Sequence, residues 1–162
     1  MEKIFYFIFL LTIGTSAQVK NKIEGLIIES PCELFYTRNI GDKNNYSCNY
    51  EKNGYLINYS VLVSNVYNET KAFNKQEEKQ YHEAFLNEAK LNAERNKERT
   101  KYISFNGKKA LVIEAYLNYS DVKLKNTLIV FFYKKKNFIA NIVSNDFEKS
   151  NLNSLLSSIK LK

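Results

Sequence analysis

The stretch TLIVFFYKKKNFIANIVS, residues 127–144, decides the fold of this chain. Thr127 to Tyr133 is apolar at nearly every position, which is typical of a strand in the middle of a sheet covered on both faces. Lys134 to Asn137 supplies a polar turn, and Phe138 to Ser144 is apolar and β-branched again. The pattern predicts a β-hairpin whose first strand is central and doubly covered.

A second hairpin and a long helix precede this stretch. Asn106-Gly107 is a strong two-residue turn signal, and it separates strands predicted over Lys101 to Phe105 and Lys108 to Tyr119. Earlier, Asn74 to Glu98 contains neither glycine nor proline. Its apolar residues recur at helical spacing: Tyr81, Phe85, Leu86, Ala89 and Ala93. We therefore expect one long amphipathic helix that packs a narrow stripe against a sheet.

The first third of the chain is predicted to form strands. They cover Lys22 to Ile28, Glu33 to Thr37, Tyr46 to Glu51 and Tyr55 to Tyr67. A turn at Asn53-Gly54 would pair Tyr50 with Ile57, Cys48 with Tyr59 and Tyr46 with Val61. A turn around Ile40-Gly41 would place Cys32 opposite Cys48 and Leu34 opposite Tyr46. Both turns collect the apolar side chains on one face, so the two predictions agree with each other.

A closing helix completes the expected order of elements. Asp146 is predicted as its N-cap, and its apolar side runs from Phe147 to Ile159. The chain then reads as strands, one long helix, four strands and one short helix. This order predicts the α+β class, an antiparallel meander sheet with one long helix and one C-terminal helix, arranged as an α/β/α sandwich.

Three segments of this pattern resemble the PsbP-like fold, the α/β sandwich shared with the Mog-type Ran-binding proteins. They are the meander that ends in Tyr55–Tyr67, the hairpin over residues 102–110, and the run from Leu128 through Phe147 into the closing helix. The resemblance lies in element order and covers most of residues 23–160. It implies a sandwich fold and a non-catalytic binding or assembly role, since members of this fold are mostly of that kind.

The first seventeen residues have the layout of a secretory signal peptide. Lys3 precedes the apolar run Ile4 to Ile13, and Thr15-Ser16-Ala17 offers small residues for cleavage after Ala17. The run is shorter than the roughly 20 apolar residues that a transmembrane helix needs. We therefore expect an exported protein, periplasmic or secreted, with no stable membrane span after cleavage. Residues 18–162 would form a single domain, because about 145 residues suit one core.

The two cysteines are interpreted in the light of export. Cysteines of an exported domain usually pair, and Cys32–Cys48 would form a cross-strand disulfide on the apolar face of the meander. The alternative, a reactive thiol, needs an activating neighbour. The single histidine, His82, is far from both cysteines in the sequence.

The net charge of +7 favours a negatively charged partner. It would suit an unknown protein or an anionic envelope or glycan component. Nucleic acid is a poor fit, because the chain has 21 lysines and only 3 arginines, and arginine is the side chain that nucleic-acid sites favour.

Few side chains suggest chemistry. Two basic hairpin tips could form an anion-binding patch, comprising Lys108, Lys109, Lys134, Lys135 and Lys136. Glu114 would be a partly buried carboxylate in need of a partner if a helix covers its face of the sheet. His82 has no triad context and is assigned a structural or surface role. The sequence offers no catalytic set, no metal-ligand set and no cofactor motif.

Two functional hypotheses follow from the sequence. The first is a small exported, non-catalytic binding or assembly protein. The second is a small exported hydrolase that uses carboxylates such as Glu114, or a lipid or glycan carrier with a pocket between sheet and helix.

Overall fold

The computed structural model describes residues 18–52, 54–65, 73–148 and 150–161. The proposed signal peptide, residues 1–17, and Asn53 of the first hairpin turn lie outside these ranges. Within them, the chain forms ten strands and two helices, and every strand pairing is antiparallel. The protein belongs to the α+β class, as the sequence predicts.

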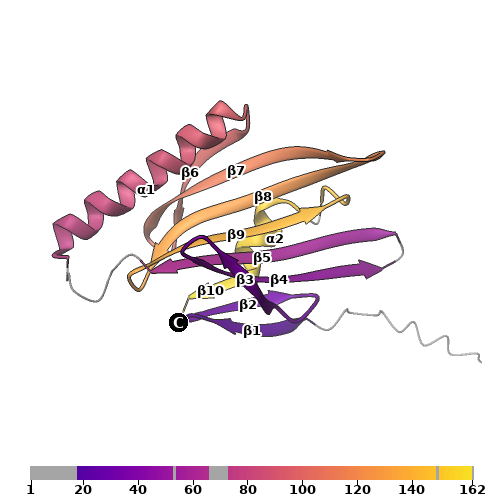
Figure 1. Ribbon diagram of the computed structural model, residues 1–162, viewed down its shortest axis with the longest axis horizontal. Helices are drawn as coiled ribbons and strands as arrows, with labels where there is room; N and C mark the ends of the chain where they lie inside the picture. The colour runs from indigo at the N-terminus through magenta and orange to yellow at the C-terminus, as the bar shows by residue number, and fades with distance from the viewer. Residues whose placement is uncertain (1–17, 53, 66–72, 149, 162) are drawn as a thin grey trace, which may run out of the picture.

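A seven-stranded sheet occupies the centre of the molecule (Figure 1). Its strands, in spatial order, are β3 (Phe35–Ile40), β4 (Lys43–Lys52), β5 (Tyr55–Asn65), β9 (Lys136–Ser144), β8 (Val122–Tyr133), β7 (Lys108–Tyr119) and β6 (Arg99–Phe105). The stretch over residues 127–144 supplies the end of β8 and all of β9, and both are interior strands of the sheet. Phe131 and Phe132 point to opposite faces and are both almost fully buried, so β8 is doubly covered as predicted.

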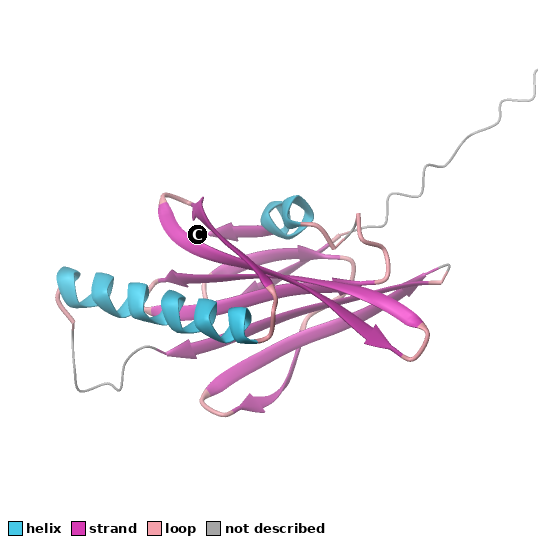
Figure 2. Cartoon of the chain, turned by 90° about the horizontal axis from the view of Figure 1, so that it is seen from above, coloured by secondary structure: helices cyan, strands magenta, loops and turns pink. Residues whose placement is uncertain are grey.

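Helix α1 (Lys75–Arg95) covers one face of the sheet over β6, β7 and β8. Figure 2 shows it running along this face. The helix begins at a capping box, in which the Asn74 side chain accepts from the Glu77 backbone N–H and the Glu77 carboxylate accepts from the Asn74 backbone N–H. Leu86 and Ala93 are buried against the sheet, which confirms the predicted stripe.

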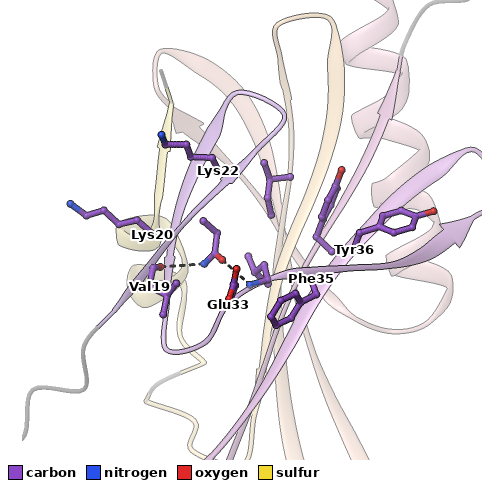
Figure 3. Close-up of a pocket in the computed structure, with 10 residues that line it drawn as sticks. Val19, Lys20, Lys22, Glu33, Phe35 and Tyr36 are labelled. Carbon is purple, nitrogen blue, oxygen red and sulfur yellow. Dashed lines mark hydrogen bonds between the residues drawn. The ribbon is translucent and has the colours of Figure 1, made fainter.

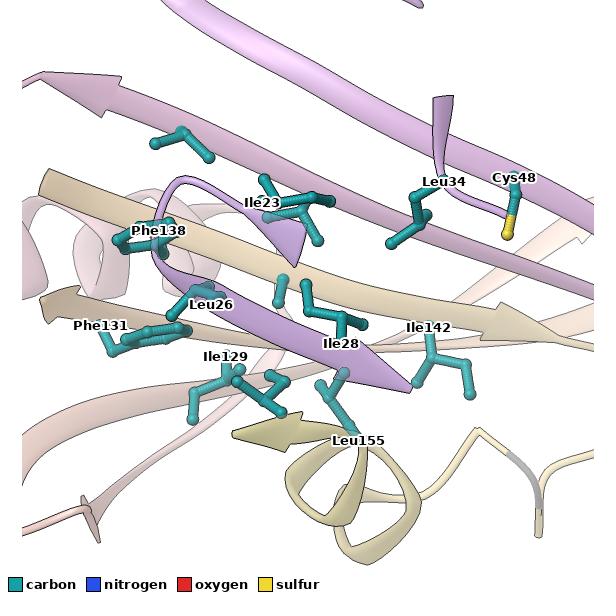
Figure 4. Close-up of a cluster of buried hydrophobic side chains, with 14 of the residues drawn as sticks. Ile23, Leu26, Ile28, Leu34, Cys48, Ile129, Phe131, Phe138, Ile142 and Leu155 are labelled. Atoms are coloured by element: carbon teal, nitrogen blue, oxygen red, sulfur yellow. The ribbon is translucent and has the colours of Figure 1, made fainter. Parts of the chain in front are cut away.

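The opposite face carries a second, three-stranded sheet. It comprises β1 (Val19–Ile23), β2 (Leu26–Ser30) and β10 (Ile159–Leu161) in the order β1-β2-β10, and the short helix α2 (Leu152–Ser158) lies beside it. Figure 4 shows the core between the layers, in which Leu26 and Ile28 of β2 meet Phe131 and Phe138 of the large sheet. Burying these large side chains is the main stabilising term for this side of the fold.

The hairpin predictions hold for the two pairs of strands that an Asn-Gly sequence separates. Tyr50 pairs with Ile57, Cys48 with Tyr59 and Tyr46 with Val61, all as expected. The strands around Asn106-Gly107 also lie where the sequence places them.

Two predictions fail near the N-terminus. The segment Lys22 to Ile28, read as one strand, is a hairpin that turns at Glu24-Gly25, where both residues have positive φ. The turn around Gly41 exists, but Tyr46 pairs with Tyr36 rather than with Leu34. The difference arises mainly at the turn, which lies at Gly41-Asp42 and pairs Ile40 with Lys43. A bulge between Tyr36 and Arg38 then shifts the register by one further residue.

The C-terminal helix also differs from the prediction. It begins at the N-cap Asn151 rather than at Asp146, whose carboxylate instead accepts from the Glu148 backbone N–H in a preceding turn. It ends before Ile159, which starts β10 and pairs with Ile28. The order Leu155-Leu156-Ser157-Ser158-Ile159 does not by itself show where the helix ends, and the pairing of Ile159 with Ile28 of β2 decides it.

Candidate functional site

The predicted disulfide is present, but it does not join two strands. Cys32 lies in the bend between β2 and β3, and it is bonded to the buried Cys48 of β4 with 6.0 Å between the Cα atoms. The disulfide ties this bend to β4 of the large sheet. It therefore fixes the segment that connects β2 of the small sheet to the edge strand β3.

Asn21 connects the same region through hydrogen bonds. Its side chain is 6% exposed. The Asn21 amide nitrogen donates to Ser30 Oγ at 2.8 Å and to the Ile28 carbonyl at 3.2 Å, and its carbonyl oxygen accepts from the Leu34 backbone N–H at 2.7 Å. One buried amide therefore joins β1, β2 and the start of β3.

A groove of about 280 Å³ lies above Asn21, between β1 and the start of β3. Figure 3 shows Val19 and Lys22 on the β1 side and Phe35 and Tyr36 on the β3 side. Both bordering strands are sheet edges, because β1 pairs only with β2 and β3 only with β4 in the described sheets.

Strand β3 is unusual because all six of its residues are exposed. Phe35 is 61% and Tyr36 is 55% exposed, although aromatic side chains normally bury a large area. Tyr36 is nonetheless held in place, since its hydroxyl donates to Asn39 Oδ1 at 2.8 Å and its ring meets Tyr46 edge-on at 5.8 Å. The edge thus presents the exposed Phe35 and a positioned Tyr36 beside a backbone edge that pairs with no other described strand.

The two basic hairpin tips lie at the same end of the large sheet. The antiparallel pairing of β7 with β8 places Lys108, where β7 begins, near Tyr133, where β8 ends. Their lysines diverge, however. Lys136 forms an ion pair with Glu24 of the small-sheet turn, and the Lys134 side chain passes beside Gly25. Lys135 is exposed at the same tip.

Lys108 and Lys109 instead face helix α1. They border a second cavity, of about 350 Å³, between the first turns of the helix and the β6–β7 hairpin. His82 and Phe132 also line it, and their rings lie 5.5 Å apart. Burial of the ring, followed by the charge of Lys108, lowers the pKa of His82 below its usual value.

Glu114 is partly buried and forms a salt bridge with Lys125. Lys125 Nζ lies 2.9 Å from Glu114 Oε1, and the two side chains are 14% and 27% exposed respectively. Glu114 lines neither the groove nor the second cavity. Its contacts describe a structural ion pair between β7 and β8.

Removing the cation from this pair should destabilise the protein. We expect Lys125→Met to lower the free energy of unfolding by about 1–2 kcal/mol, because it leaves a half-buried carboxylate unpaired. The exposed Lys90–Glu94 pair on α1 is the control, and Lys90→Met should cost less than about 0.5 kcal/mol. Urea denaturation of both variants measures the difference, and equal losses would contradict a special role for burial.

Comparisons with known proteins leave the family open. No protein-family model matches the sequence, and no curated protein matches it either. In the described residues, no helix has the length and apolarity needed to cross a membrane. The same residues contain no group of three or more His, Cys, Asp or Glu side chains placed to hold a metal ion.

Sequence reasoning missed the groove and its central amide. Asn21 is one of 21 asparagines, and nothing in its neighbours distinguishes a buried amide from a surface one. The available signal was Gly25, whose positive φ of 91° belongs to the turn that folds β1 back onto β2. Recognising that turn would have separated β1 from β2 and paired them as a hairpin, whereas the edge position of β1 depends on the pairing of β10 with the other side of β2.

Proposed function

We propose that the protein is an exported, non-catalytic binding protein that takes up an extended acidic segment of a partner protein along β3. The observation that carries the proposal is the outer edge of β3, which is unpaired within the described sheets and fully exposed along its length. An extended peptide can add to such an edge as a further strand, with main-chain hydrogen bonds supplying affinity and side-chain contacts supplying specificity.

The aromatic side chains of β3 suit this mode of binding. Tyrosine and phenylalanine lose little conformational entropy when they are covered, and they are enriched at the centres of interfaces. Phe35 and Tyr36 point to opposite faces of the strand, so an added strand would contact one ring on each face. Tyr36 is already positioned by Tyr46 and Asn39, which reduces the ordering cost of binding.

Charge favours an acidic partner over a second copy of the chain. Lys20 and Lys22 are exposed on β1, and Arg38 is exposed at the middle of β3. Antiparallel pairing of two β3 strands would bring the two Arg38 side chains close to the twofold axis of the dimer, where like charges are destabilising. Each molecule also carries a net charge of +7, which adds to the repulsion. The bulge between Tyr36 and Arg38 also disfavours regular edge-to-edge association.

Two further considerations support export and a binding role. A disulfide between Cys32 and Cys48 fits an oxidising compartment. The PsbP-like resemblance of the sequence points to the same class of function, since members of that fold are mostly binding or assembly factors. The alternative function, a hydrolase built on Glu114, is less well supported because that carboxylate is paired with Lys125 outside both cavities.

The test is selection of a phage-displayed peptide library against the disulfide-bonded protein. We expect enrichment of extended sequences that combine acidic and apolar residues. In a peptide strand, only every second main-chain N–H group pairs with the edge of β3. For a selected peptide, N-methylation of that set of residues should therefore abolish binding. N-methylation of the alternate set should leave binding unchanged.

A pair of variants locates the binding edge. Phe35→Ser/Tyr36→Ser should weaken peptide binding by about tenfold or more. Tyr119→Ser removes an aromatic ring that is 74% exposed on β7 and should have no effect. Peptides that bind both variants equally well, or a protein that dimerises through β3 instead, would overturn the proposal.

A further inference from the structure

The cavity beneath the start of α1 has an unbalanced charge. Four lysines line it, two from the helix (Lys75 and Lys79) and two from the hairpin (Lys108 and Lys109), against only two glutamates, Glu78 and Glu83. None of the four ammonium groups forms a salt bridge with a described residue. Like charges gathered in this way repel one another, and a bound anion would relieve that repulsion.

Aromatic rings hold the hairpin lysines in place. Lys109 Nζ lies 4.0 Å from the centroid of the Tyr102 ring, and Lys108 Nζ lies 5.3 Å from that of Phe132. Cation–π contacts of this kind orient the ammonium groups without neutralising them. Tyr102 is itself fixed by a hydrogen bond of 2.8 Å to Asn87 of α1.

His82 supplies a polar atom without a partner. Its Nε2 is buried and makes no hydrogen bond to any described residue. A buried polar atom left in that state is destabilising, so a ligand atom that reaches it would gain affinity. The helix terminus provides no comparable group, because Asn74 already accepts from the backbone N–H groups of Gln76 and Glu77.

We infer that this cavity binds an oxyanion of the phosphate or sulfate type, carried by a lipid headgroup or by a small soluble ester. Lys75, Lys79, Lys108 and Lys109 supply the charge, and His82 supplies a hydrogen bond to the anion. The volume of about 350 Å³ lies at the lower end of small-molecule sites, so it accommodates a headgroup-sized ligand. The cavity shares no residue with the groove beside β3, and the inference stands apart from the proposed function.

Binding should depend on pH through His82. The groups that act on its ring are Lys108 and Lys109 from the hairpin, which disfavour its protonation, and Glu78 and Glu83 from the helix, which favour it. A bound oxyanion adds negative charge beside the ring and should raise the pKa of His82. By linkage, affinity for the anion should then increase as the pH falls from about 7.5 to about 5.5.

Inorganic sulfate is the appropriate probe for this dependence, because sulfate does not titrate in the same range. NMR signals of the His82 ring should shift on addition of sulfate, and the pKa read from them should rise. His82→Gln should retain binding at the higher pH and lose the pH dependence. Ring signals that stay unmoved at sulfate concentrations up to about 0.1 M would overturn the inference.

Two double variants separate a site from a general charge effect. Lys108→Gln/Lys109→Gln should reduce sulfate affinity by about tenfold or more. Lys101→Gln/Lys123→Gln removes the same charge outside the cavity, and its Lys123 also lies over an aromatic ring, 5.0 Å from the centroid of Tyr116. That control should change affinity less than about twofold; equal losses in the two variants would contradict a defined site.

Two further arms identify the source of the anion. Vesicles of phosphatidylcholine with added phosphatidic acid present the group on a surface, and glucose 6-phosphate presents it in solution. Tighter binding to the vesicles than to pure phosphatidylcholine, lost in the Lys108→Gln/Lys109→Gln variant, supports a lipid headgroup. Binding of glucose 6-phosphate with the same loss supports a soluble ester. If vesicles, glucose 6-phosphate and sulfate all fail to bind, the inference is overturned. That result would not affect the proposed binding of a peptide along β3.

Discussion

Replacing Asn21 with leucine should lower the free energy of unfolding by about 3–5 kcal/mol. The substitution removes the acceptor of the buried Leu34 N–H and the donor to Ser30 Oγ and the Ile28 carbonyl. Each buried group that loses its partner costs about 1–3 kcal/mol, and the losses occur together because one amide serves three elements.

Asn137→Leu is the matched control for this variant. Asn137 is also buried, at 3% exposed, but its amide makes one hydrogen bond of 3.3 Å to the Tyr81 hydroxyl, and its carbonyl oxygen has no partner among the described residues. We expect that substitution to change stability by less than about 1 kcal/mol. Equilibrium denaturation in urea compares the two, and similar losses would show that burial alone, rather than the hydrogen bonds of Asn21, sets the cost.

The Asn21→Leu variant should also affect binding. The Asn21 side chain borders the groove between β1 and β3 and holds Leu34 directly before Phe35. We expect a selected peptide to bind this variant more weakly than it binds Asn137→Leu, even at temperatures at which both variants are folded. Unchanged peptide affinity would show that the hydrogen bonds of Asn21 stabilise the fold but are not needed for peptide binding at β3.

Opening the disulfide is the second change with a large expected effect. Cys32→Ala/Cys48→Ala should lower the free energy of unfolding by about 3 kcal/mol, since the bond closes a loop over a sequence separation of 16. The loss should be local before it is global. Hydrogen exchange should accelerate first in β3, which the bond anchors at its start.

Reduction of the unmodified protein provides the control. Dithiothreitol should shift its denaturation midpoint towards that of the double variant, and it should leave the variant itself unchanged. A midpoint that does not respond to the reductant would mean that Asn21 and its hydrogen bonds hold the bend without help from the disulfide.

These elements also show what could be predicted from the sequence. The two Asn-Gly sequences predict their hairpins because Lys52 pairs with Tyr55 and Phe105 with Lys108, and two residues between the strands determine the register of every following pair. Helix α1 follows from periodicity and lacks internal breakers. The position of β3 could not be derived, because its register depends on the exact place of the turn at Gly41-Asp42 and on a bulge, and its start depends on a buried amide 13 residues earlier.

The candidate sites divide in the same way. Lys108 and Lys109 could be singled out from their adjacency in a turn, and Cys32 and Cys48 from the tendency of cysteines in an exported domain to pair. Their companions could not: Lys75, Lys79 and His82 reach the hairpin only because α1 packs across β6 to β8. Residues that come together only through tertiary packing have no fixed spacing in the sequence by which they could be recognised.

The last strand has a consequence for the order in which the protein is made. Ile159 of β10 pairs with Ile28 of β2, and Lys160 bonds to Glu29 across 131 positions of sequence. The β1–β2 hairpin is synthesised before every other described element, and its β10 partner emerges after them. Closing a loop of that length costs about 4 kcal/mol in chain entropy, and such contacts form late. The nascent chain therefore cannot complete its small sheet until translation has passed Leu161, so the pairing of β10 with β2 is a late step in folding.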